Sequence, residues 1–126
     1  MDEESSAGPW IILVLRFGKN VENPTREQLI EALSELYDDE KLSAIPKGIR
    51  DEHPSSWLSY GFDDGPEYVV DVYDGGTVIF VKNADQDDAE PLWERKMKGV
   101  TKEEVLRLWT LLIAGEVAQL ESEDWA

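Results

Sequence analysis

The segment from Glu67 to Lys82 constrains the fold more than any other part of the chain, because it predicts two apolar strands joined by a turn. Asp74-Gly75-Gly76 separates the runs 67–73 and 77–82, and Asp-Gly or Gly-Gly between such runs is a strong signal for a β-hairpin. The strands of a hairpin are antiparallel. We therefore expect the fold to be built on an antiparallel sheet.

Further strands and two helices are expected around this hairpin. Apolar runs predict strands at 9–17, 56–62 and 92–98. Thr25 with Gln28, and Thr101 with Glu104, have the spacing of helix capping boxes, and a helical stripe of apolar residues follows each pair. The expectation is a single α+β domain at 9–126, with an antiparallel sheet of four to five strands and two main helices packed on it. Residues 1–8 are expected to form a disordered acidic tail.

The turn length predicts which strand residues share a face of the sheet. With two-residue turns, Val70, Val72, Ile79 and Val81 would share one face with Tyr68 and Trp57. The other face would carry Val69, Asp71, Tyr73, Val78, Phe80, Leu58, Tyr60 and Phe62, whereas a three-residue turn would change this grouping. Both faces are apolar, and two helices cover only one. The second face would be covered by the strand at 10–17 with the loop at 42–54, by a second copy of the chain, or by a partner.

The residue types present exclude several classes of site. The 126 residues include no cysteine and one histidine, which excludes disulfides, thiolate zinc sites and two-histidine metal motifs. Gly75-Gly76 leads into a strand, so it lacks the helix N-terminus of a phosphate-binding loop. Asn83, Asp85, Asp87 and Glu94 follow EF-hand spacing, but Asp88 stands where that loop needs glycine. We therefore expect no enzyme, no metal and no cofactor.

The charge balance points to the kind of partner. Twelve Lys and Arg against 28 Asp and Glu give a net charge of −16, which disfavours binding to nucleic acid or to an anionic membrane. Three explanations stay open: an acid-biased proteome, recognition of a basic protein, and cation binding. The segment 1–8 is acidic, unlike the start of a secretion signal, and the apolar run at 10–15 is too short to span a bilayer. The expected location is cytoplasmic.

A tryptophan beside carboxylates is a typical anchor of a protein interface. The chain has five tryptophans; Trp93 and Trp109 are expected in the core, whereas Trp57 on a strand and Trp125 in an acidic tail are the two expected to be exposed. The candidate partner-binding residues are Trp57 with Asp63, Asp64, Glu67, Asp71 and Asp74 around the strand 67–73, and Asp85, Asp87, Asp88 and Glu90 in the acidic loop 83–91. Packing in the core is the alternative role for the tryptophans, and solvation or turn formation for the carboxylates.

The layout resembles the immunity proteins of bacterial polymorphic-toxin systems, in particular an α+β family marked by a GxGG motif and tryptophans. The matching stretches are Tyr73–Gly76, where Tyr73 takes the place of the first glycine, and Val100–Trp125, which contains a capped helix and the ending Glu123-Asp124-Trp125. The resemblance implies a cytoplasmic protein that binds and neutralises a cognate toxin. Together with the acidity, it suggests a basic toxin such as a nuclease. A self-associating structural or regulatory domain, a homodimer through an uncovered sheet face, is the alternative.

Charge reversal in the acidic loop tests its part in binding. Replacing Asp85, Asp87 and Asp88 with lysine should slow association with a basic partner, and the effect should shrink as salt is raised, because exposed charges steer encounter through a screened field. Stopped-flow association rates at two salt concentrations measure this. An unchanged rate would remove the loop from the interface.

Overall fold

The fold is centred on one antiparallel sheet of six strands. The computed structural model describes residues 9–38, 40, 43–52, 55–62, 66–84, 91–123 and 125. The strands are β1 (Trp10–Val14), β2 (Asn20–Glu22), β3 (Ser55–Gly61), β4 (Glu67–Tyr73), β5 (Val78–Asn83) and β6 (Trp93–Met97), in the order β2-β1-β3-β4-β5-β6. The α+β class and the antiparallel sheet are confirmed. The expected number of strands was too low, because β2 has only three residues and little apolar pattern.

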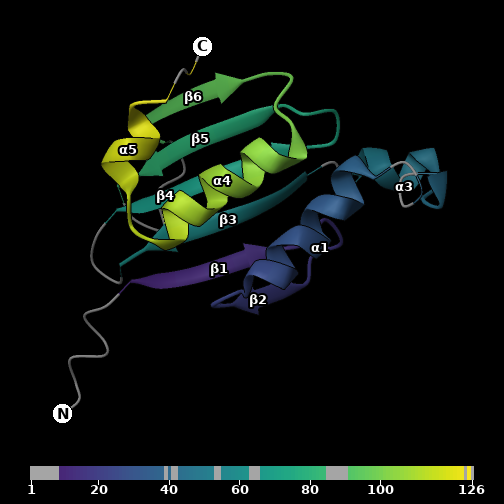
Figure 1. Cartoon of the computed structure of the whole chain (residues 1–126), viewed down its shortest axis with the longest axis horizontal. Coiled ribbons are helices and arrows are strands. Elements are labelled where there is room, and N and C mark those ends of the chain that lie inside the picture. Colours follow the sequence, from purple (N-terminus) through teal and green to yellow (C-terminus); the bar gives the residue numbers. More distant parts are fainter. Residues whose placement is uncertain are drawn as a thin grey trace.

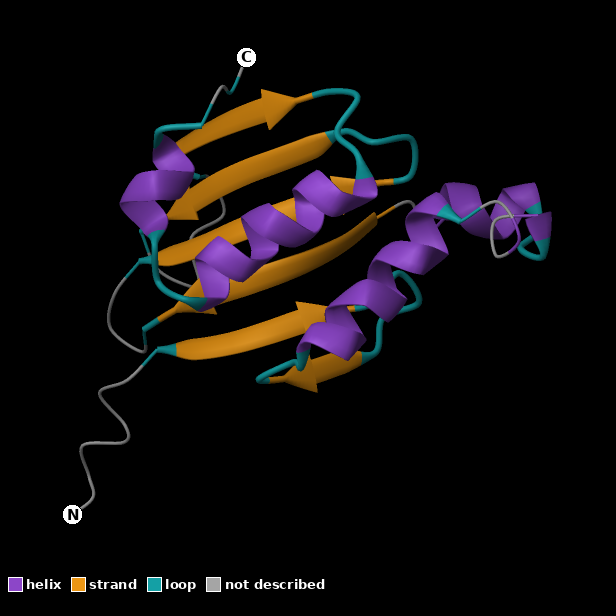
Figure 2. Cartoon of the chain, viewed as in Figure 1, coloured by secondary structure: helices purple, strands orange, loops and turns teal. Residues whose placement is uncertain are grey.

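Two long helices pack on one side of this sheet (Figures 1 and 2). The helices are α1 (Arg26–Tyr37), α3 (Lys47–Glu52), α4 (Lys102–Ile113) and α5 (Val117–Glu121). α4 contacts β3 and β4, and α1 contacts α4 and β3, whereas α3 lies beyond the end of α1 and away from the middle of the sheet. The two main helices are therefore where the sequence predicted them. The acidic tail predicted at 1–8 lies outside the described residues.

The helix starts follow the predicted caps, with one difference. Thr25 and Gln28 form both hydrogen bonds of a capping box. The hydroxyl of Thr101 accepts a hydrogen bond from the Glu104 amide at 3.2 Å. The Glu104 carboxylate instead binds Arg107 one turn further on, so the second cap is carried by the threonine.

The core lies between the helices and one face of the sheet. Trp109 of α4 is fully buried and donates a hydrogen bond from Nε1 to the carbonyl of Val70 at 3.1 Å. The strand side chains beneath it include Leu13, Leu58, Val70, Val72, Val78 and Phe80, all fully buried. Burial of apolar surface of this kind is the main term that stabilises a small domain.

The turn between β4 and β5 has three residues, which corrects the predicted grouping of side chains. Tyr73 N donates to Thr77 O at 2.8 Å, and Gly75 and Gly76 take φ angles of 104° and 91°, in the region that glycine adopts readily. Val72 therefore pairs with Val78, and Gly61 pairs with Glu67. A core face results with Tyr60, Tyr68, Val70, Val72, Val78 and Phe80 together, and a second face with Trp57, Val69, Asp71, Tyr73, Ile79 and Val81.

The segment expected to cover the second face does not do so. β1 pairs with β3 inside the sheet, so the strand predicted at 10–17 extends the sheet and does not lie over it. Among the described residues of the predicted loop at 42–54, α3 lies off the sheet's end (Figure 1). In the part of the chain that the structure describes, no helix lies on the second face.

A buried arginine joins three elements at one end of the sheet. The Arg16 side chain is 0% exposed and donates to the carbonyl of Glu35 at 2.6 Å and to Asp74 Oδ2 at 3.2 Å. It therefore ties the chain after β1 to α1 and to the β4–β5 turn. A cation this deeply buried is stable only while its hydrogen-bond acceptors are in place.

Removing the charge of Asp74 should destabilise the fold. Asp74→Asn should lower the free energy of unfolding by about 2 kcal/mol, because it removes a charged hydrogen-bond acceptor from the buried Arg16. Asp38→Asn is the matched control, because Asp38 pairs with the half-buried Lys102 at 3.0 Å in a more exposed position. It should cost less than about 1 kcal/mol. Urea denaturation measures both, and equal costs would contradict a structural role for the Arg16–Asp74 pair.

Candidate functional site

The face of the sheet turned away from the helices is the candidate interaction surface, and we call it the open face. Its apolar side chains come from four strands and are half-buried: Ile12, Val14, Trp57, Val69, Ile79 and Val81. All of the helices that contact the sheet are on the opposite side (Figure 2). A contiguous set of apolar side chains that stays partly accessible is a candidate interaction surface.

Trp57 and Asp71 are neighbours at the centre of the open face. They pair directly across β3 and β4, and Asp71 pairs in turn with Ile79 of β5. Paired residues on one face of an antiparallel sheet have Cβ atoms about 5 Å apart. A large aromatic ring and a carboxylate therefore lie side by side, surrounded by aliphatic side chains.

A second tryptophan, Trp10 at the start of β1, lies against the end of the neighbouring strand β3. A Cβ atom added at Gly61 would be 2.7 Å from Cζ2 of Trp10, so the ring lies flat where β3 has no side chain. Ser59, the next residue of β3 on this face, is also small, and it is buried. Trp10 Nε1 is buried without a hydrogen-bond partner among the described residues. Trp10 was not among the predicted site residues, since its place within an apolar run gave it no distinguishing signal.

Asp71 is held in an environment that disfavours its charge. Burial raises the pKa of Asp71 to about 6, and hydrogen bonding from Ser55, Tyr73 and the Val72 backbone opposes this shift only in part. Its Oδ1 atom is buried and has no hydrogen-bond partner among the described residues. The nearby Asp71 charge in turn raises the pKa of the Tyr73 hydroxyl. Strongly shifted ionisable groups of this kind gather at functional sites.

The open face carries an excess of negative charge. By strand register it holds the carboxylates of Glu22, Glu67, Asp71 and Glu94, against the single ammonium of Lys96, within the strands described. Glu67 accepts a hydrogen bond from Asn83 Nδ2 at 2.9 Å. The face therefore combines aromatic and aliphatic surface with net acidity.

The structure brings together three of the residues predicted from the sequence. Trp57, Glu67 and Asp71 share the open face. Asp74 lies apart from them, at the turn, where it is bonded to Arg16. The remaining predicted residues, Asp63, Asp64, Asp85, Asp87, Asp88 and Glu90, lie outside the described residues, and their part in binding stays a prediction.

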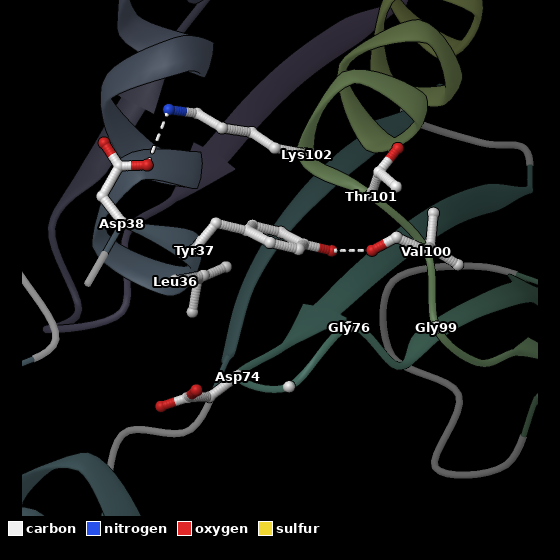
Figure 3. Close-up of a pocket in the computed structure, with 10 residues that line it drawn as sticks. Leu36, Tyr37, Asp38, Asp74, Gly76, Gly99, Val100, Thr101 and Lys102 are labelled. Carbon is white, nitrogen blue, oxygen red and sulfur yellow. Dashed lines mark hydrogen bonds and ion pairs between the residues drawn. The ribbon is translucent and has the colours of Figure 1, made fainter.

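A separate hollow of about 590 Å³ lies between the end of α1, the β4–β5 turn and the start of α4. Figure 3 shows the Tyr37 hydroxyl donating to the Val100 carbonyl at 2.7 Å, and Lys102 bound to Asp38. Burial raises the pKa of Tyr37 to about 12, which keeps it protonated. These polar groups are engaged with one another, so the hollow is a weaker candidate for a site than the open face.

Among the described residues, no three His, Asp or Glu side chains are grouped so as to hold a metal. No described helix has both the length and the apolarity to cross a membrane. Comparisons with protein-family models, with curated proteins and with solved structures give no match.

Replacing Asp71 with asparagine should change how stability depends on pH. The pKa of Asp71 in the folded state is about 6, above its ordinary value of 3.8, so the folded state binds more protons than the unfolded state between these values. The parent should therefore lose stability as pH rises from 4 to 6. Asp71→Asn has no such ionisation, so its free energy of unfolding should exceed the parent's by about 2–3 kcal/mol at pH 7.5 and by little near pH 4.

Denaturant unfolding at pH 4, 5, 6 and 7.5 measures this difference. Glu94→Gln, on the same face but exposed, is the control for removing any carboxylate from this acidic chain. A constant offset between parent and Asp71→Asn at every pH would contradict the assignment.

Proposed function

We propose that this chain is a non-enzymatic binding protein that engages a basic protein partner through the open face, in the manner of an immunity protein that neutralises its toxin. The observation that carries the proposal is the pairing of Trp57 with Asp71 at the centre of a half-buried apolar face. Large aromatic side chains with charged neighbours are the residues that dominate binding energy at protein interfaces.

The charge of the face favours a basic partner over a second copy of the chain. A two-fold dimer would bring the same surface of each copy together. The carboxylates of Glu22, Glu67 and Glu94 would then face the equally acidic open face of the other copy, in a chain with a net charge of −16, which is electrostatically unfavourable. A positively charged surface gains from the same arrangement, both in association rate and in the choice of partner.

An immunity role fits this chemistry. A nuclease has a positive cleft for the phosphate backbone, and an acidic protein surface with an apolar centre is complementary to such a cleft. Such a protein would have to bind the toxin before the toxin reaches its target, so it would act in the cytoplasm of the producing cell. Self-association through the open face is the second candidate, favoured by the half-buried aliphatic side chains at its centre.

The experiment compares two variants on the open face with a control variant on the helix side of the molecule. The partner is first captured from a lysate of the producing cell with the immobilised parent chain. Trp57→Ala should then weaken binding of this partner at least about 30-fold, the effect expected of an interface hot spot of about 2 kcal/mol. Val81→Lys, which places a positive charge on the open face, should weaken it as well. Ile30→Ala, on the exposed side of α1, is the matched control and should bind like the parent.

Titration calorimetry measures the affinities, and circular dichroism checks that each variant is folded. The activity of the isolated partner should fall to zero at one equivalent of the parent chain and persist with Trp57→Ala. Equal binding by all variants would refute the open face as the interface. A dimer of the chain alone in sedimentation, lost in Val81→Lys, would favour self-association.

A further inference from the structure

Asp71 is the carboxylate enclosed by the apolar centre of the open face. It faces Trp57 and Ser55 of β3 on one side and Ile79 of β5 on the other. Along its own strand, Val69 and Tyr73 point to the same face, because side chains alternate with a period of two. Of the four carboxylates on this face, Asp71 is therefore the one with aromatic and aliphatic neighbours around it.

The hydrogen bonding of this carboxylate is incomplete. Oδ1 is buried and has no partner among the described residues, although an ionised carboxylate accepts up to about four hydrogen bonds. The polar groups that face it are Ser55 from β3 and Tyr73 from β4. On β6, Lys96 lies opposite Ile79, two strands from Asp71 and thus roughly 10 Å away. Glu94, also on β6, lies opposite Val81, two residues further along the strand.

The neighbouring rings suit a planar cation. Trp57 lies directly across from Asp71, and Tyr73 is near enough for the Asp71 charge to raise the pKa of its hydroxyl. Aromatic faces attract cations, and guanidinium both stacks on rings and binds a carboxylate with two parallel hydrogen bonds. An ammonium is more strongly hydrated and loses more on leaving water. Asp71 keeps part of its surface exposed.

We propose that Asp71 is the specificity-determining residue of the open face, and that it binds an arginine side chain of the partner against Trp57. This rests on the proposed function only in taking the open face as the binding surface. The other carboxylates of the face then act at longer range, since Glu22 and Glu94 are exposed and Glu67 is bonded to Asn83.

Binding at Asp71 should depend on pH with a definite sign. The guanidinium binds the ionised carboxylate, and the pKa of Asp71 in the free protein is about 6. Binding therefore lowers the pKa of Asp71 and releases a proton wherever the free group is protonated. Affinity should be highest above pH 7 and should fall about tenfold for each pH unit below about 5.

The test uses a small probe, so it does not depend on identifying the partner. Acetyl-Gly-Arg-Gly-amide is titrated into the ¹⁵N-labelled chain at pH 7.5 and followed by amide chemical shifts. We expect saturable shifts at residues of β3, β4 and β5 around Asp71, with a Kd of about 1–10 mM for a single side chain. The uncharged citrulline peptide should give no saturable shift, and the lysine peptide should bind at least about threefold more weakly.

Two variants isolate the carboxylate. Asp71→Asn should weaken the arginine peptide at least about tenfold and abolish the pH dependence, whereas Glu31→Gln, at an exposed position of α1, should leave both within about twofold. Equal binding of arginine and citrulline peptides, or equal binding by Asp71→Asn and parent, would overturn the inference. One pattern of results would overturn this inference and leave the proposed function standing. In it, Trp57→Ala loses partner binding, whereas Asp71→Asn binds both the peptide and the partner like the parent.

Discussion

The hydrogen bond from Tyr73 N to Thr77 O closes the β4–β5 hairpin around three residues, and much of the molecule depends on that turn. Strand side chains alternate with a period of two, so one residue more or fewer in the turn moves every side chain of β5 to the opposite face. With this turn, Val78 and Phe80 enter the core, and Ile79 and Val81 join Asp71 outside it. The adjacent glycines at 75 and 76 make the turn possible, because both take positive φ angles.

The helices cover one face of the sheet, so the turn length decides which side chains of β5 they bury. α1 and α4 are long enough to cover one side of the sheet, and Trp109 fixes α4 there through its hydrogen bond to the Val70 carbonyl. Arg16 adds a second attachment, because it bonds both to α1 and to the turn. The side of the sheet without helices keeps its apolar residues half-buried, with Trp57 and Asp71 paired among them.

Asp71 connects stability with the proposed binding. A carboxylate whose pKa is raised by burial destabilises the folded state at neutral pH, and a fully apolar or amide side chain would not. Residues that lower stability are commonly retained where they serve binding, so the physical cost of this charge and its position beside Trp57 support the same interpretation. The overall acidity adds a long-range field, while Asp71 would set which side chain is accepted.

The sequence by itself determined the local structure: the caps at Thr25 and Thr101, the apolar stripes of two helices, the hairpin and the acidic balance, because each depends on residues close together in the chain. It also identified Trp57, Glu67 and Asp71 as candidates, yet it grouped them with the wrong neighbours. Three features were decided only by the tertiary structure: which face of the sheet is the core, the ion pair between Asp74 and the buried Arg16, and the position of the Trp10 ring over Gly61. Those features depend on turn length and on strand pairing between distant segments, which no local pattern encodes.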